Sequence, residues 1–117
     1  MARRRLKLSK LCVCVFIVIL LLFSFACEPG GEVTFQNQRN EDIKVFVTHV
    51  REDGSTDGFT DRGAIPARNS KTISITFLGD EWVNRLEIRD THGTVISSHD
   101  YKMGDLDKIG WKIVIIP

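Results

Sequence analysis

The chain has 117 residues, which is enough for one domain. Its 16 Lys and Arg residues nearly balance its 15 Asp and Glu residues, but the charges are unevenly placed. Residues 1–26 hold five basic residues and no acidic one, whereas the part from residue 28 onward has a net charge of −4. A mildly acidic body without a cluster of Lys and Arg lacks the electrostatic footprint of nucleic-acid binding, so we expect no nucleic-acid partner.

A basic segment followed by an apolar one opens the chain. All five basic residues lie within residues 1–10, and residues 11–26 carry no charge. Positive charge is held on the cytoplasmic side of a membrane, so we expect the residues after the apolar run to be exported. The run from Leu11 to Phe23 fits the core of a signal peptide and is shorter than the roughly 20 apolar residues of a simple membrane span. An uncleaved membrane anchor is the alternative, and it also places the body outside the cytoplasm.

The residues that end this run, Phe23-Ser24-Phe25-Ala26-Cys27, resemble a lipobox, the processing site of bacterial lipoproteins. In that family a dedicated peptidase cuts before the cysteine, whose sulfur carries a diacylglycerol. Ala26 is the small residue that the cut requires, whereas Ser24 stands where the family usually has Leu. The resemblance implies a signal peptide over residues 1–26 and a Cys27 that is lipidated with fatty acids such as palmitate. It also implies a tether over residues 27–31 that holds a domain on the extracytoplasmic side of a bacterial cell membrane.

The cysteine count agrees with this interpretation. Cys12 and Cys14 would leave with the signal peptide, so Cys27 would be the single cysteine of the mature chain. No disulfide could then form within the mature chain. A bridge-free domain of about 90 residues must rely on its own apolar core, which is feasible at this size.

After residue 31 the apolar residues recur with a period of two, which is the pattern of β-strands. We expect strands at residues 33–36, 43–50, 59–65, 72–77, 82–89, 95–101 and 111–116. Residues 51–58 are a polar loop, and Asp90–Gly93 is typical of a hairpin turn. Residues 105–109 form one helical turn, with Asp105 as its cap and Gly110 as its end. The last strand has apolar residues on both faces, so we expect it to lie between two neighbours.

About seven short strands with regularly spaced turns predict an all-β domain over residues 32–117, a small immunoglobulin-like β-sandwich with one short helical turn. The domain would follow an N-terminal hydrophobic signal helix. The Cys–Trp–Cys hallmark of antibody domains is absent, and an open sheet with one helix is the alternative architecture. The residues Val-Thr-Phe-Gln-Asn-Gln from residue 33, with Ile65-Pro66-Ala67 later, resemble small envelope β-domains of unassigned role.

The loop after the second expected strand has some of the oxygens of a calcium site. Five residues fall at ligand positions of an EF-hand loop: Asp53, Ser55, Asp57, Phe59 (through its carbonyl) and Asp61. Gly58 takes the glycine position, but Ala64 stands where the bidentate glutamate is needed. Polar loops also contain these residue types simply because they turn the chain. We therefore expect a polar loop without metal and keep the five residues as calcium candidates.

Two kinds of aromatic position differ in what they predict. Trp82 and Trp111 lie in expected strands of a small domain and are predicted to belong to the core. Phe46 and Val50 lie on the less apolar face of their strand and are candidates for a contact patch.

No catalytic constellation is recognisable in the sequence. His49, His92 and His99 lack the spacing of zinc ligands, and we expect His92 and His99 to face solvent. The predicted function is a membrane-anchored, non-enzymatic β-domain without a cofactor that binds or supports an envelope protein or polymer. One alternative is an envelope hydrolase that uses scattered carboxylates such as Asp57, Asp61 and Asp80. The other is calcium-dependent adhesion through the loop that contains Asp53.

Overall fold

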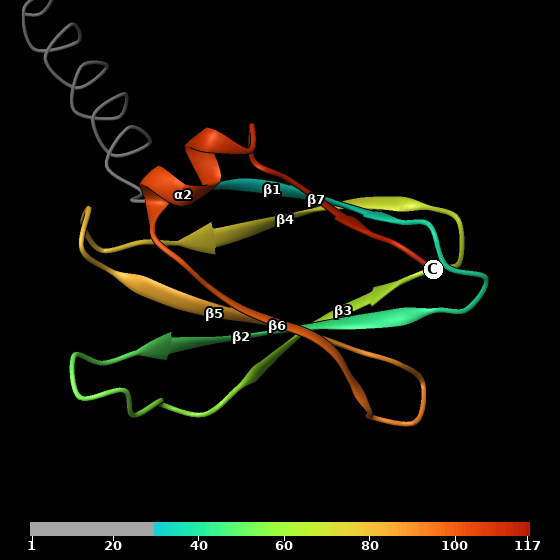
Figure 1. The fold of residues 1–117 in the computed structure, drawn as a ribbon, viewed down its shortest axis with the longest axis horizontal. Coiled ribbons are helices and arrows are strands. Elements are labelled where there is room, and N and C mark those ends of the chain that lie inside the picture. Colours follow the sequence, from blue (N-terminus) through green and yellow to red (C-terminus); the bar gives the residue numbers. More distant parts are fainter. Residues whose placement is uncertain (1–29) are drawn as a thin grey trace, which may run out of the picture.

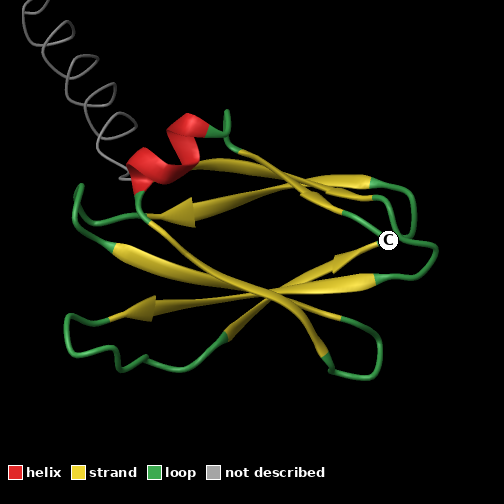
Figure 2. Cartoon of the chain, viewed as in Figure 1, coloured by secondary structure: helices red, strands yellow, loops and turns green. Residues whose placement is uncertain are grey.

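The computed structural model describes residues 30–117, which form two β-sheets and one short helix (Figure 1). The strands are β1 (Gly30–Asn37), β2 (Ile43–Val50), β3 (Thr60–Ile65), β4 (Ser70–Thr76), β5 (Val83–Arg89), β6 (Val95–Tyr101) and β7 (Lys112–Ile115). The helix α2 (Met103–Lys108) connects β6 to β7. Figure 2 shows the two sheets lying face to face, with the helix at one end. The predicted all-β sandwich with one helical turn is confirmed.

The sheet topology follows that of an immunoglobulin-like sandwich except at the C-terminal strand. The strand order is β4–β1–β7 in the smaller sheet and β3–β2–β5–β6 in the larger one. If β1 and β4 are equated with strands B and E of an immunoglobulin domain, the larger sheet has the order C′–C–F–G of a variable-type domain. The C-terminal β7 then lies beside β1, where an immunoglobulin domain has its first strand. β7 runs parallel to β1, whereas the other paired strands in residues 30–117 are antiparallel.

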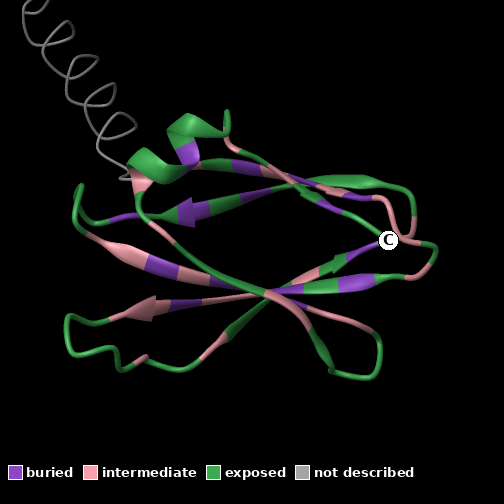
Figure 3. Cartoon of the chain, viewed as in Figure 1, coloured by how far each residue is buried: buried purple, intermediate pink, exposed green. Residues whose placement is uncertain are grey.

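Side chains that alternate along the strands fill the space between the sheets. In β1, Val33 and Phe35 are fully buried, whereas Glu32 is exposed. Figure 3 shows this alternation of buried and exposed positions on both sheets. The buried apolar core consists of Val33, Phe35, Ile43, Val45, Ile65, Ile73, Ile75, Phe77, Leu86, Ile88, Leu106 and Ile115.

The first strand begins inside the segment that the sequence predicts to be a tether. Gly30 and Gly31 pair with Thr76 and Ile75 of β4. A Cβ atom on Gly31 would lie 2.6 Å from the ring of Trp111, so glycine is needed for that ring to pack on the strand. The two glycines therefore belong to the folded domain rather than to a linker.

β7 lies at an edge of the smaller sheet, so the prediction of a last strand between two neighbours is wrong. Ile115 is 5 % exposed and packs in the core, and Ile113 is half-buried against it. Val114 and Ile116 are 43 % and 68 % exposed. One apolar face of β7 is thus covered by the core and the other is open to solvent. The sequence pattern alone does not distinguish such a strand from one that is buried on both sides.

The helix α2 spans Met103–Lys108 rather than the predicted residues 105–109, and its cap differs from the prediction. Asp105 is the third residue of α2, not its cap, and its carboxylate accepts a hydrogen bond from the Lys102 backbone N–H (2.9 Å). Gly110 adopts a φ of 65° and ends the helix as predicted. The N–H groups of Gly110 and Trp111 donate to the carbonyls of Asp107 and Leu106, which satisfies the last turn in a Schellman motif.

Two buried asparagines link the sheets at opposite ends of the sandwich. Asn37, 1 % exposed at the end of β1, shares its side-chain amide between the carbonyl of Glu41 (2.9 Å) and those of Ile65 and Pro66 (3.2 Å each) at the end of β3. Asn84, 4 % exposed in β5, donates to the Thr76 carbonyl at the end of β4 (2.7 Å). The bonds to the ends of β3 and β4 run from one sheet to the other, so the amides fix how the sheets stack.

The burial of β7 predicts very different effects for two neighbouring isoleucines. Ile115→Ala should destabilise a fragment of residues 30–117 by roughly 2–5 kcal/mol, because it leaves a cavity in the core. Ile116→Ala should change the free energy of unfolding by less than about 0.5 kcal/mol, because the side chain is exposed. Urea denaturation of both variants measures this. Equal effects would show that β7 does not pack as described.

Candidate functional site

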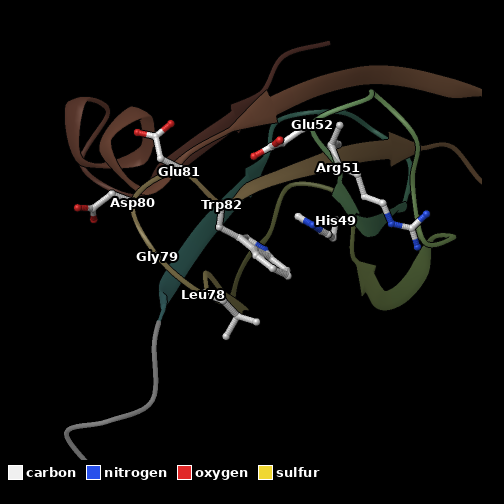
Figure 4. A pocket seen from close by; sticks show the side chains of 9 residues that line it. His49, Arg51, Glu52, Leu78, Gly79, Asp80, Glu81 and Trp82 are labelled. Atoms are coloured by element: carbon white, nitrogen blue, oxygen red, sulfur yellow. The ribbon is translucent and has the colours of Figure 1, made fainter.

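A groove lies at the end of the sandwich where β2 finishes and the loop from β4 to β5 crosses to the larger sheet (Figure 4). Its volume is about 520 Å³, which is in the range of small-ligand sites. Two segments line it: residues 49–52, from the end of β2, and residues 78–82, which precede β5. The two segments meet because Val50 is the register partner of Val83.

The floor of the groove is a stacked pair of aromatic rings. The ring centroids of His49 and Trp82 are 3.5 Å apart and the rings are tilted by only 12°. The indole N–H of Trp82 donates to the side-chain oxygen of Asn84 (3.2 Å), the same residue that links the two sheets. His49 Nδ1 lies 3.0 Å from the carbonyl oxygen of Val83. A carbonyl can only accept, so Nδ1 is the donor, and both rings are held in place by β5.

The walls of the groove combine apolar and acidic side chains. Leu78 is 61 % exposed, and Val50 is half-buried. Three carboxylates stand around the groove: Glu52, Asp80 and Glu81. Figure 4 shows Glu52 and Glu81 on the same side of the Trp82 ring, with Leu78 on the opposite side. A rigid aromatic floor beside an apolar wall and an acidic rim is suited to binding, and the groups are too exposed to suggest desolvated catalytic carboxylates.

The basic group of the groove is already paired. Arg51 forms an ion pair with Asp57, and it also donates to the Ser55 hydroxyl (3.4 Å). Figure 4 shows its side chain directed away from the Trp82 ring. The charge that the groove presents to a ligand is therefore mainly that of its carboxylates.

The calcium candidates do not converge. Asp53 accepts hydrogen bonds from the Ser55 hydroxyl (2.6 Å) and the Ser55 backbone N–H (2.9 Å), and these bonds lower the pKa of its carboxyl below the ordinary value. Asp61 accepts from the Gly63 N–H (2.8 Å), which lowers its pKa, with a smaller contribution from Lys44. Asp57 is paired with Arg51. Within residues 30–117, no three His, Cys, Asp or Glu side chains form a group that could hold a metal ion.

The predicted contact patch is divided between two places. Val50 lines the groove, whereas Phe46 lies on the outer face of the larger sheet under the guanidinium of Arg89, 3.9 Å from its ring centroid. The same guanidinium lies 5.3 Å from the ring centroid of Phe59, so the ring of this calcium candidate packs over the sheet as well. Arg89 also donates to Glu87 (2.6 Å). Phe46 is therefore covered and does not join Val50 in one surface.

The remaining singled-out residues are dispersed. Trp111 packs against the core, meets Phe77 edge to face and donates its indole N–H to Asp107 (2.7 Å). His92 and His99 are exposed, as predicted. Of the carboxylates considered for a hydrolase, Asp80 stands at the groove, while Asp57 and Asp61 belong to the β2–β3 loop and to β3.

The groove is not evident in the sequence because its two floor residues, His49 and Trp82, lie far apart in the chain. Trp82 was expected in the core, and it does pack against the core, but it is only half-buried. His49 lies on the same, inward face of β2 as Val45 and Val47. It therefore points between the sheets, at the end of the sandwich where the buried core ends. The register partner of the inward-facing His49 is Asn84, and Trp82 comes two residues before Asn84 on the same side of the chain. A histidine and a tryptophan in this relation are the signal that could have indicated the site.

Comparisons with protein-family models, with curated proteins and with solved structures find no match for this chain. Among residues 30–117, no helix has the length and apolar character needed to cross a membrane. The predicted signal peptide and Cys27 lie outside the described residues.

The hydrogen bonds in the 51–61 loop predict that calcium has little effect on the domain. Millimolar calcium should leave the melting temperature of residues 30–117 unchanged, because the carboxylates are engaged separately and the bidentate ligand is missing. Binding to the native state would raise the melting temperature, which thermal unfolding detects. A rise that disappears in Asp61→Asn would contradict this prediction.

Proposed function

We propose that the protein is a bacterial lipoprotein whose β-sandwich is a non-enzymatic binding module on the extracytoplasmic side of a cell membrane. Cleavage before Cys27 removes residues 1–26, and lipid on Cys27 holds the module at the membrane. The His49–Trp82 groove, lined by residues 49–52 and 78–82, is its binding site. The partner is a component of the cell envelope.

The rigid aromatic floor of the groove is the observation that carries the binding role. Aromatic rings give large contact area, and rings already fixed by hydrogen bonds need little further ordering when a ligand arrives. Trp82 is held by Asn84 and His49 by Val83. A hydrolase would need a nucleophile beside a base or a pair of desolvated carboxylates. In the described part of the chain, the groove offers a histidine whose Nδ1 is committed to a carbonyl, and carboxylates that stand in solvent on the rim or beside it.

The position of the groove fits a short anchor. Gly30 is the register partner of Thr76, two residues before Leu78, so the described chain starts beside the groove's second wall. Cys27 is three residues before Gly30 in the sequence. A fully extended chain of that length spans at most about 10 Å. A lipid on Cys27 would thus keep the groove near the membrane surface, where envelope components anchored in the same membrane are within reach.

The anchor is tested by a pair of cysteine variants expressed in a bacterial host. Cys27→Ser should leave the full-length precursor uncut and abolish incorporation of labelled palmitate, because the sulfur that carries the lipid is gone. Cys14→Ser is the matched control. Cys14 lies in the leader, so this variant should be labelled and cleaved like the wild type. Several acyl chains hold a protein firmly, so the mature wild type should fractionate with membranes. Wild-type protein that is unlabelled and keeps residues 1–26 would contradict the lipoprotein proposal and favour the uncleaved anchor.

A further inference from the structure

The chemistry of the His49–Trp82 groove narrows the class of ligand, given the binding role proposed above. Three carboxylates line it, from Glu52, Asp80 and Glu81, against one guanidinium, from Arg51. Arg51 is already neutralised by its ion pair with Asp57, and its side chain is directed away from the Trp82 ring (Figure 4). Glu81 pairs with Lys102 at 3.1 Å, but the Glu81 side chain is 90 % exposed. Such an exposed pair is weak enough for another cation to compete with it.

The groove also has an apolar part that a simple ion would not use. Val50 and Leu78 line it together with Trp82, and Leu78 is 61 % exposed without a partner covering it in the described chain. A ligand that matches both features has an aliphatic stem and a positively charged head. Lysine and arginine side chains have this construction, because they lay their methylene groups on apolar surface and keep the charge at a polar edge. A cation beside an indole ring is further stabilised by the ring's quadrupole.

We propose that the His49–Trp82 groove binds a lysine- or arginine-bearing segment of a partner protein. The stem of the basic side chain packs on Leu78 and Trp82, and its cationic head lies between Glu52 and Glu81. The amine of a lipid headgroup has the same charge but brings a phosphate with it. The Arg51 guanidinium that could receive that phosphate is committed to Asp57, so the groove favours a polypeptide cation over a lipid amine.

The test uses the full chain in maltoside micelles, because this detergent has no charged headgroup. The probe is a blocked peptide of alternating glycine and lysine, and its control is the same peptide with every lysine acetylated, which keeps the length and removes the charge. The indole N–H signals of Trp82 and Trp111 are followed by NMR during titration and assigned with Trp111→Phe. The Trp82 signal should move and saturate with the lysine peptide, and the Trp111 signal should not.

Charge variants locate the contact. Glu52→Gln and Glu81→Gln should each weaken binding about two- to fivefold, because each removes one charge interaction at the exposed surface. Glu32→Gln is the matched control, since Glu32 is an exposed carboxylate in β1 that does not line the groove, and its affinity should equal that of the wild type. Binding should also weaken when the salt concentration rises from about 0.05 to about 0.5 M, because screening shortens the reach of the carboxylates.

Three results would overturn the inference. Equal shifts with the lysine and the acetylated peptide would show that the groove binds polypeptide without selecting charge. The binding role would then be supported, and the proposed preference for a cationic side chain would be contradicted. A saturable shift with phosphatidylethanolamine added to the micelles, and none with the lysine peptide, would assign the groove to a lipid. No movement of the Trp82 signal with either peptide or with this lipid would contradict both the inference and the groove as a binding site.

Discussion

The arrangement of the two sheets depends on buried amide groups that hydrogen-bond across the sandwich. The side chain of Asn37 reaches the carbonyls of Ile65 and Pro66, and its oxygen accepts the Arg39 N–H (2.9 Å). Leaving such a buried group unsatisfied costs about 1–3 kcal/mol, so the sheets are held at the distance and angle that satisfy it. An apolar core alone is non-directional and would permit several ways of stacking. The asparagines therefore select one of them.

The geometry of the groove depends on Asn84, the second asparagine that links the sheets. Asn84 donates to Thr76 in the smaller sheet and accepts from the Trp82 indole, so one side chain both joins the sheets and orients the floor of the groove. Along the side where β3 faces β4, Arg62 donates to the Ser74 carbonyl (2.6 Å) and closes the sandwich in a similar way. The binding surface is thus built on fixed strand ends, and a ligand meets a surface that is already ordered.

The sequence predicts the strands well because their pattern is local. In residues 33–35 and 73–75 apolar and polar side chains alternate, which is expected of any strand with one buried face. The turn at Asp90–Gly93 contains residue types that favour turns by themselves. The place of β7 was mispredicted because an edge strand and a central strand can share one apolar pattern. The groove was missed because it depends on the register between β2 and β5, which brings Val50 opposite Val83. Phe46 was expected in a contact patch, but Arg89, distant in sequence, covers it.

Unfolding of three asparagine variants by urea tests most directly whether buried amides hold the sheets together. Asn37→Ala and Asn84→Ala should each lower the free energy of unfolding by roughly 1–3 kcal/mol. The first removes a donor from the buried Ile65 carbonyl, and the second removes the partner of both the Thr76 carbonyl and the Trp82 indole N–H. Asn69→Ala should lie within about 0.5 kcal/mol of the wild type, because its amide donates to the Ala67 carbonyl at the exposed surface. If all three variants unfold at the same urea concentration as the wild type, the amides do not set the stacking of the sheets and the account of this fold is wrong.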